Sequence, residues 1–209
     1  MPDLATLDAH GILSEPATLT IKRLLPGPIE RVWAYLTESD RRRQWLAAGQ
    51  MEMKVGAPFE LVWRNDELAD PPAERPAGFA AEHRMQSRIT ELDPPHKLAF
   101  TWQGSGDVSF ELQHQGEEVL LTVTHRRLPD RATLLKVAAG WHQHLDTLVA
   151  SATGAAPEPF WPGWRFGAKP FLARVSSAVP RTISWILICT SRSRWPPATL
   201  NTKGRGMPT

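Results

Sequence analysis

Apolar and polar residues alternate with a period of two in several stretches of the chain, and this pattern predicts β-strands with one buried face. The stretches are Ala17–Leu25, Phe59–Trp63, Met85–Leu92, Lys97–Gln103, Asp107–Gln113 and Glu118–Arg126. Short connectors rich in Gly, Pro and Asp join the last four, which predicts an antiparallel meander. One connector, Gly104-Ser105-Gly106, is interpreted as a hairpin turn.

The alternation also covers Met51–Val55, so a further short extended segment is expected before the turn at Gly56-Ala57-Pro58. Residues 65–82 are rich in proline and acidic residues, which indicates a long surface loop. Long loops in compact domains are often functional, so this segment is a candidate cover for a site.

A period near 3.6 marks three helices. The first begins after Pro28, and its apolar face comprises Ile29, Val32, Trp33 and Leu36. A second, short helix is predicted from Ser39 to Leu46. Asp130 is expected to cap a long helix that runs from Arg131 to about Ala152 and ends at Gly154. The apolar stripe of this helix comprises Leu134, Val137, Ala138, Trp141, Leu145 and Leu148.

The elements follow the order strand, two helices, a run of strands and a long final helix. This order predicts an α+β fold in which a curved antiparallel sheet wraps around the C-terminal helix. We expect a lead-in over residues 1–16, one domain over residues 17–164, and a basic tail over residues 165–209.

The tail differs from the domain in charge. All 22 acidic residues precede Phe160, and residues 165–209 hold eight of the 24 basic ones. Residues 1–164, with 16 basic and 22 acidic side chains, carry a formal charge of −6, and the tail carries +8. We interpret the tail as disordered or as a non-homologous extension of the kind that a shifted reading frame produces; a natural basic tail is the alternative. The basic charge therefore predicts no nucleic-acid surface on the domain.

No targeting or metal-binding pattern stands out in the sequence. Cys189 is the only cysteine, which excludes an internal disulfide. The first residues lack the basic and apolar regions of a signal peptide, and the most apolar run, Ile183–Cys189, is too short for a membrane span. His142 and His144 diverge on a helix and cannot chelate one ion together. We expect a cytoplasmic protein without membrane span, cofactor or metal.

Several motifs occur in an order that is similar to that of a known family. They are Pro28–Trp33, Trp45 in the second helix, Gly56–Phe59, Leu98–Trp102, Leu121–His125 and Gly140-Trp141. Over about Thr18–Trp164 the chain resembles the START-like (SRPBCC) superfamily, in its polyketide cyclase-like branch homologous to the activator of heat-shock protein 90 ATPase. The resemblance implies a helix-grip fold with a deep cavity between the sheet and the final helix. Superfamily members bind lipids, hormones or polyketides, and a minority are cyclases or aromatases.

Nine tryptophans against one tyrosine point to indole rings that line a core or a cavity. The expected ligand-binding residues are Trp33, Trp45, Phe59, Trp63, Phe100, Trp102, Phe110, His125, Trp141, His144, Leu145 and Leu148. The alternative is that these rings fill a solid interior, as aromatic stripes usually do.

Two histidines are candidates for acid–base chemistry. His125 is in register with the inward face of its strand, and His144 borders the apolar stripe of the final helix. Either side chain could hydrogen-bond or protonate a ligand carbonyl near neutral pH. The alternative is a half-exposed histidine paired with a backbone carbonyl.

Other charged residues offer little catalytic pattern. The carboxylates on or near strands are Glu60, Glu82, Glu91 and Glu111. No Ser-His-Asp, Cys-His or Gly-x-Ser-x-Gly arrangement occurs. Arg41-Arg42-Arg43 is interpreted as a solvated helix face rather than a phosphate site. Arg64 and Arg88 could anchor a ligand carboxylate.

Together these patterns favour a binding protein over an enzyme. We expect a small hydrophobic or aromatic molecule to bind beneath residues 65–82, closed in by Trp141, Leu145 and Leu148. One alternative is a cyclase- or hydratase-type enzyme with His125 or His144 as general acid or base. Another is an interaction protein that modulates a chaperone ATPase. A homodimer is left open.

Overall fold

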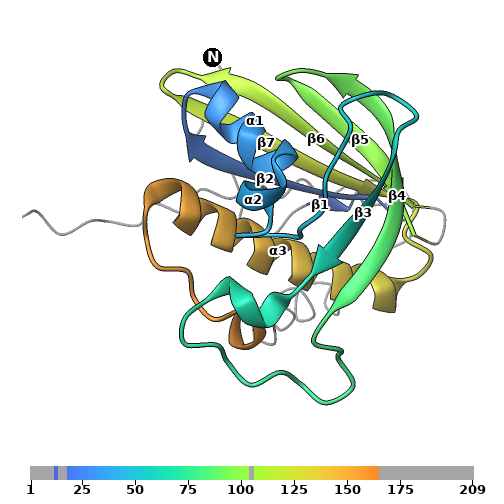
Figure 1. Cartoon of the computed structure of the whole chain (residues 1–209), viewed down its shortest axis with the longest axis vertical. Coiled ribbons are helices and arrows are strands. Elements are labelled where there is room, and N and C mark those ends of the chain that lie inside the picture. Colours follow the sequence, from blue (N-terminus) through green and yellow to red (C-terminus); the bar gives the residue numbers. More distant parts are fainter. Residues whose placement is uncertain (1–11, 14–17, 104–105, 165–209) are drawn as a thin grey trace, which may run out of the picture.

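Seven antiparallel strands form one curved sheet in the order β1-β2-β7-β6-β5-β4-β3 (Figure 1). The computed structural model describes residues 12–13, 18–103 and 106–164. The strands are β1 (Ile12–Leu13), β2 (Leu19–Pro26), β3 (Pro58–Trp63), β4 (His83–Asp93), β5 (Lys97–Trp102), β6 (Gly106–Gln115) and β7 (Glu118–Arg126). The helices are α1 (Ile29–Thr37), α2 (Ser39–Arg42), the 3-10 helix η2 (Asn65–Leu68) and α3 (Arg131–Thr153), and residues 160–164 are also helical.

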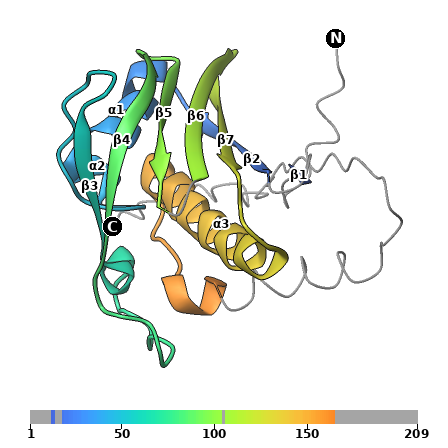
Figure 2. The same cartoon turned by 90° about the vertical axis from the view of Figure 1, so that its right-hand side faces the viewer.

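The long helix α3 crosses one face of the sheet, which confirms the predicted α+β, helix-grip architecture (Figures 1 and 2). It begins where predicted, because the Asp130 carboxylate accepts a hydrogen bond from the Thr133 backbone N–H over 2.7 Å. It ends at Gly154, whose φ of 76° is readily adopted only by glycine. None of the described helices is long and apolar enough to cross a membrane.

The strand β2 returns beside β7 and so joins the beginning of the domain to its end. Eight residue pairs connect the two strands, from Leu19 opposite His125 to Pro26 opposite Glu118. The helix α1 then packs against the end of α3, where the Tyr35 hydroxyl donates to the Ser151 carbonyl over 3.2 Å. Sheet, α1 and α3 therefore enclose a single interior.

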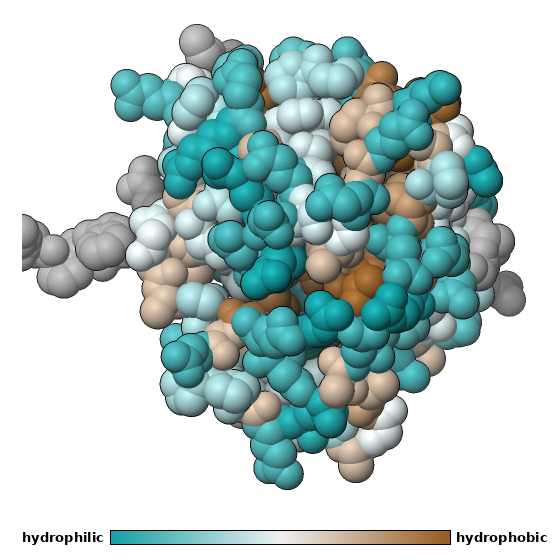
Figure 3. Space-filling model, viewed as in Figure 1, coloured by the Kyte–Doolittle hydropathy of each residue, from teal (hydrophilic) through white to brown (hydrophobic). Residues whose placement is uncertain are grey.

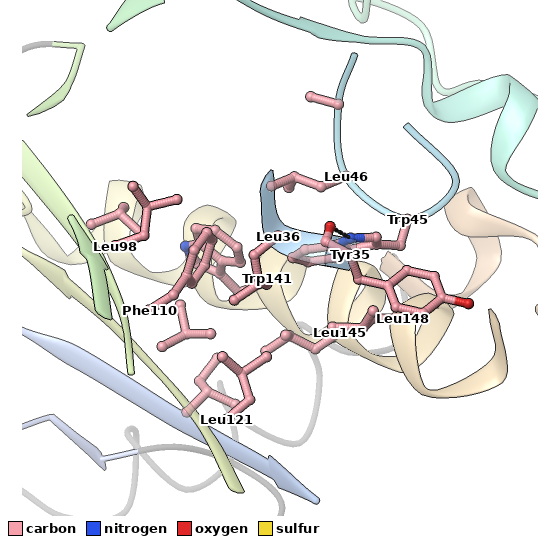
Figure 4. Packing of buried hydrophobic residues seen from close by; sticks show 14 of the residues in the cluster. Tyr35, Leu36, Trp45, Leu46, Leu98, Phe110, Leu121, Trp141, Leu145 and Leu148 are labelled. Carbon is pink, nitrogen blue, oxygen red and sulfur yellow. Dashed lines mark hydrogen bonds between the residues drawn. The ribbon is translucent and has the colours of Figure 1, made fainter. Parts of the chain in front are cut away.

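Most of that interior is filled by interlocking aromatic and aliphatic side chains (Figure 4). The ring centroid of Phe110 lies 5.6 Å from that of Phe100 and 5.9 Å from that of Trp141, which points inward from α3. The indole N–H of Trp45 is also satisfied, because it donates to the Tyr35 carbonyl over 2.9 Å. In this region the aromatic rings fill a solid core, as the alternative interpretation of the sequence holds, and do not line a cavity.

The predicted extended segment at Met51–Val55 is wrong. Residues 53–55 form a bend and the start of a turn, and none of the described strands pairs with residues 51–55. Met53 and Val55 are 38% and 56% exposed, so the apolar side of this alternating segment is not buried against the core. The turn that follows needs Gly56, whose φ is 87°.

The interpretation of Arg41-Arg42-Arg43 as a solvated face is wrong for its middle residue. The α-helix ends at Arg42, four residues before the predicted end, and the Arg42 side chain is fully buried. Its guanidinium donates to the carbonyls of Thr37 and Gly49, and burial lowers its pKa to about 10. Arg42 is therefore an internal brace between the end of α1 and the following loop.

Two further expectations concern the chain ends. Where only a lead-in was expected, Ile12 and Leu13 form β1 and pair with β2. The predicted loop at residues 65–82 begins with the helix η2. The expectation for the tail at 165–209 lies outside the described residues, as do two residues of the predicted turn at 104–106.

Candidate ligand pocket

Two adjoining pockets lie at the end of the sheet where β3 and β5 meet α3. The larger has a volume of about 660 Å³ and is called the outer pocket; the smaller has about 110 Å³ and is called the inner pocket. Both are lined by Trp63, Trp102, Gly140 and His144. These four residues therefore lie at the boundary between the two spaces, which is called the throat. On the face seen in Figure 3, hydrophobic side chains show through among hydrophilic ones near the middle.

The sheet supplies one wall of the outer pocket. Trp63 ends β3 and Trp102 ends β5, and their ring centroids lie 5.7 Å apart with an edge-to-face inclination of 63°. His83 and Met85 of β4 and the neighbouring Gln103 complete this wall. The opposite wall comes from α3, where Gly140 has no side chain and therefore leaves the helix backbone uncovered.

The roof comes from two segments that are distant in sequence, residues 65–82 and residues 160–164. Phe79 lies 5.2 Å from Trp161 and 5.0 Å from Trp164 between ring centroids. The indole N–H of Trp161 donates to the Asp66 carboxylate over 2.7 Å, which ties the segments together. Figure 2 shows both segments at the same end of the molecule, beside α3.

Neither pocket is lined by the side chain of a Lys, Arg, Asp or Glu residue. The proposed carboxylate anchors are occupied elsewhere, because Arg64 pairs with Glu82 over 2.7 Å and the exposed Arg88 donates to the Gly56 carbonyl. The polar side chains in the lining are Asn65, His83, Gln103 and His144. The pocket is thus an aromatic cleft with a few hydrogen-bonding side chains, as binding sites for small molecules usually are.

His144 is held in one tautomer by the backbone. Its Nδ1 lies 2.7 Å from the carbonyl oxygen of Trp45, and because a carbonyl can only accept, Nδ1 carries the proton. The ring is 7% exposed and packs 4.7 Å from Phe160. Burial lowers the pKa of His144 to about 4, although the bond to Trp45 opposes that shift. At neutral pH the other nitrogen, Nε2, therefore presents a lone pair.

His125 faces inward, as the alternation predicted, but lines neither pocket. Its Nδ1 accepts the indole N–H of Trp141 over 3.2 Å, and its ring lies 4.9 Å from that of Trp102. Burial lowers its pKa to about 4, and the nearby charge of Asp107 only partly opposes this. His125 is thus a neutral member of the core, and at pH 7 neither histidine carries the extra proton that a general acid needs.

Of the twelve residues expected to bind a ligand, the structure brings four to the pockets. Trp63, Trp102 and His144 line both, and Trp141 lines the inner one. The other eight line neither pocket: Trp33, Trp45, Phe59, Phe100, Phe110, His125, Leu145 and Leu148. Of these, Trp33 is partly buried and packs against the core, while the rest are buried.

The candidate carboxylates form ion pairs near the surface. Glu60 pairs with Arg84 over 2.7 Å, and Glu91 pairs with Lys97 over 2.6 Å. Hydrogen bonds from arginine and lysine lower the pKa values of Glu82 and Glu91. None of the four lines a pocket, and the described residues contain no group of three potential metal ligands.

Sequence reasoning missed the residues of the roof after α3. Phe160 and Trp161 are buried with Leu68 in a small cluster of their own, and Trp164 packs against it. Three aromatic residues within five positions are the available signal. Their partners lie some 95 residues earlier in the chain, so no local period reveals the contact.

Fold and pocket together define a helix-grip protein with a ligand-binding architecture. Residues 26–152 match the family described as Activator of Hsp90 ATPase homolog 1-like protein, and the chain belongs to that family, a branch of the START-like superfamily. No curated protein matches the chain.

Solved structures of similar proteins extend across several bacteria. A protein from Bordetella parapertussis is 39% identical, with a TM-score of 0.68, covering 83% of this chain and 94% of its own. CalU16 from Micromonospora echinospora is 22% identical, with a TM-score of 0.58 and coverage of 82% and 98%. A conserved protein of unknown function from Enterococcus faecalis is 20% identical, with a TM-score of 0.59 and coverage of 79% and 90%. The last two show likeness of fold alone.

Proposed function

We propose that this protein binds a small hydrophobic or aromatic molecule in the outer pocket, with one end of the molecule reaching the throat. The observation that carries the proposal is the pocket itself, a partly open space of about 660 Å³ with aromatic walls and no side chain of Lys, Arg, Asp or Glu in its lining. Pockets of roughly 300–1,000 Å³ with such walls bury most of a small organic ligand.

Burial of apolar surface supplies the driving force, at about 25 cal/mol per Å² removed from water. Trp63 and Trp102 offer ring faces and edges from the sheet, while Phe79 and Trp161 cover the ligand from the roof. Residues 65–82 thus act as the cover that the sequence suggested. A cytoplasmic location and a homodimer stay predictions.

The alternative functions receive less support from the arrangement. With a pKa of about 4, His144 is a weak base, and its neutral form has no proton at Nε2 to give to a carbonyl. A chaperone-directed role, which the family's name suggests, requires an exposed docking face. The large apolar side chains exposed among the described residues are Met53, Val55 and Phe79, and Phe79 already packs within the roof.

The test uses a library of lipids and small aromatic compounds, with changes in tryptophan fluorescence and melting temperature as readouts. Because Phe79 is 44% exposed, Phe79→Ala should leave the unliganded melting temperature within about 2 °C while weakening binding about tenfold. The matched control is Val55→Ala, which removes an exposed apolar side chain outside the pocket. A library that moves neither readout in the wild-type protein would refute the proposal.

A further inference from the structure

Gly140 is an unusual residue for its position in the middle of α3. A Cβ built onto it meets no heavy atom within 4 Å, so no neighbour requires the glycine. Its φ is not positive either, so the backbone does not require it. A glycine inside a helix is less favourable than alanine by about 0.8–1.0 kcal/mol. A side chain at this position would project into the free space at the throat, because Gly140 lines both the outer and the inner pocket.

His144 follows Gly140 by one helical turn and therefore faces the same side of α3. Its Nδ1 is committed to the Trp45 carbonyl, and its Nε2 has no hydrogen-bond partner among the described residues. A lone pair at this place attracts a hydroxyl or N–H donor and repels the oxygen of a carboxylate. Since no Lys or Arg side chain lines either pocket, a charged carboxylate would also lose its hydration without a guanidinium or ammonium partner.

The shape of the throat and of the inner pocket further restricts which ligands can fit. The indoles of Trp63 and Trp102 border the throat in edge-to-face contact with each other, with ring centroids 5.7 Å apart, so a flat ring fits against this pair of surfaces and not between them. The inner pocket of about 110 Å³ is smaller than the apolar cavity of about 150 Å³ that binds benzene, so it admits one ring only with help from the open space at Gly140.

We propose, building on the function proposed above, that the throat selects an uncharged aromatic hydroxyl compound. Its ring lies over Gly140 and against the paired indoles of Trp63 and Trp102, and its hydroxyl donates a hydrogen bond to Nε2 of His144. Gly140 is then a specificity-determining residue that provides room, and His144 is the acceptor that distinguishes a phenol from a plain hydrocarbon.

Three probes of one ring system separate these contributions: 2-naphthol, naphthalene and 2-naphthoate, each measured by equilibrium dialysis at pH 7. The wild-type protein should bind 2-naphthol about five- to tenfold more tightly than naphthalene, as one added hydrogen bond allows. It should bind 2-naphthoate at least tenfold more weakly than 2-naphthol.

Two variants assign the preference to residues. In His144→Leu the ratio of the 2-naphthol and naphthalene affinities should fall to about one, and this ratio is internal to the variant, so a loss of stability does not obscure it. In His114→Gln, a change at an exposed histidine of β6, the ratio should stay at its wild-type value. Gly140→Ala should raise the urea midpoint, because alanine has the better helix propensity. The same change should weaken the binding of 2-naphthol at least tenfold.

The outcomes separate this inference from the proposed function. If all three probes bind equally well, or if the preference for 2-naphthol survives in His144→Leu, the phenol assignment is overturned and the apolar pocket stands. If Gly140→Ala binds 2-naphthol as tightly as the wild type, the throat is overturned. If neither these probes nor the larger library bind, both proposals fail together.

Discussion

The indole N–H of Trp141 donates a hydrogen bond to Nδ1 of His125, so α3 is joined to β7 by a polar contact inside an apolar core. Trp141 is 3% exposed and His125 is 1% exposed, so water cannot replace either partner. The bond fixes the orientation of Trp141 at the inner pocket, and it keeps His125 in the tautomer protonated at Nε2. The polar contact therefore positions one wall of the pocket from within the core.

Trp141→Phe should therefore cost more than the lost ring area. It leaves a buried nitrogen of His125 unpaired, and we expect a loss of about 1–3 kcal/mol in the free energy of unfolding. Urea denaturation followed by circular dichroism measures it. The control is Trp33→Phe. It also replaces an indole by a smaller phenyl ring, but it breaks no hydrogen bond of the described residues. Equal losses in both variants would show that the bond contributes nothing.

The two buried histidines should make stability depend on pH. In the folded protein their pKa values are lowered to about 4, below the ordinary value of 6.5. As the pH falls below 6.5 the unfolded chain takes up protons that the folded protein refuses, so stability is constant above pH 7 and is lost progressively from pH 6.5 to 4. Each unit of pKa difference is worth about 1.4 kcal/mol.

Urea midpoints at pH 7, 6, 5 and 4.5 test this dependence. His144→Leu should flatten the decline between pH 6.5 and 5, whereas His114→Gln should leave it unchanged. The carboxylates with lowered pKa values, such as Glu82 and Glu91, lose their contributions only at lower pH. A midpoint that stays level from pH 7 to pH 5 in the wild type contradicts the burial of both rings.

Arg42 should tolerate no replacement, even by another cation. Its separate nitrogens reach the Thr37 carbonyl, over 2.9 Å, and the Gly49 carbonyl, and a lysine ammonium cannot span both. Arg42→Lys should lower the free energy of unfolding by about 1–3 kcal/mol in chemical denaturation. Arg43→Lys, at an exposed position, should stay within about 0.5 kcal/mol of wild type. Similar values for the two variants would argue against the bracing role.

Asp66 should govern how firmly the roof is attached. Its carboxylate accepts from Trp161 and pairs with Arg75, so Asp66→Ala frees residues 65–82 from residues 160–164. Faster amide hydrogen exchange in residues 66–82 and stronger acrylamide quenching of tryptophan fluorescence are expected. Asp70→Ala, an exposed change in the same loop, serves as the control and should alter neither. Unchanged exchange in Asp66→Ala would mean that aromatic packing alone holds the roof.

Elements with a long, uninterrupted period were predictable from the sequence. The strands β4 to β7 lie within about two residues of their predicted bounds, and α3 has the predicted cap at Asp130 and end at Gly154. In these segments each buried face repeats at the spacing of its own secondary structure. Local pattern and tertiary environment therefore agree.

The failures share a physical cause, since each depends on a neighbour that the local sequence does not specify. Met51–Val55 alternates in polarity but pairs with no strand in the part of the chain that the structure describes. The sequence predicts a solvated side chain for Arg42, because it does not indicate that the carbonyls of Thr37 and Gly49 accept hydrogen bonds from it in the fold. Likewise, alternation placed Phe100 and Phe110 inward correctly, yet only three-dimensional packing decides whether such rings interlock or leave a space.

The division between a filled core and a roofed pocket has a consequence for how such proteins diversify. The roof is carried by residues 65–82 and 160–164, which contact the core through few side chains, whereas the interlocked phenylalanines lie elsewhere in the interior. Related chains can thus change the compounds they accept by altering the cover while they keep the same hydrophobic core. Libraries that retarget this scaffold should accordingly randomise those two segments and leave the sheet intact.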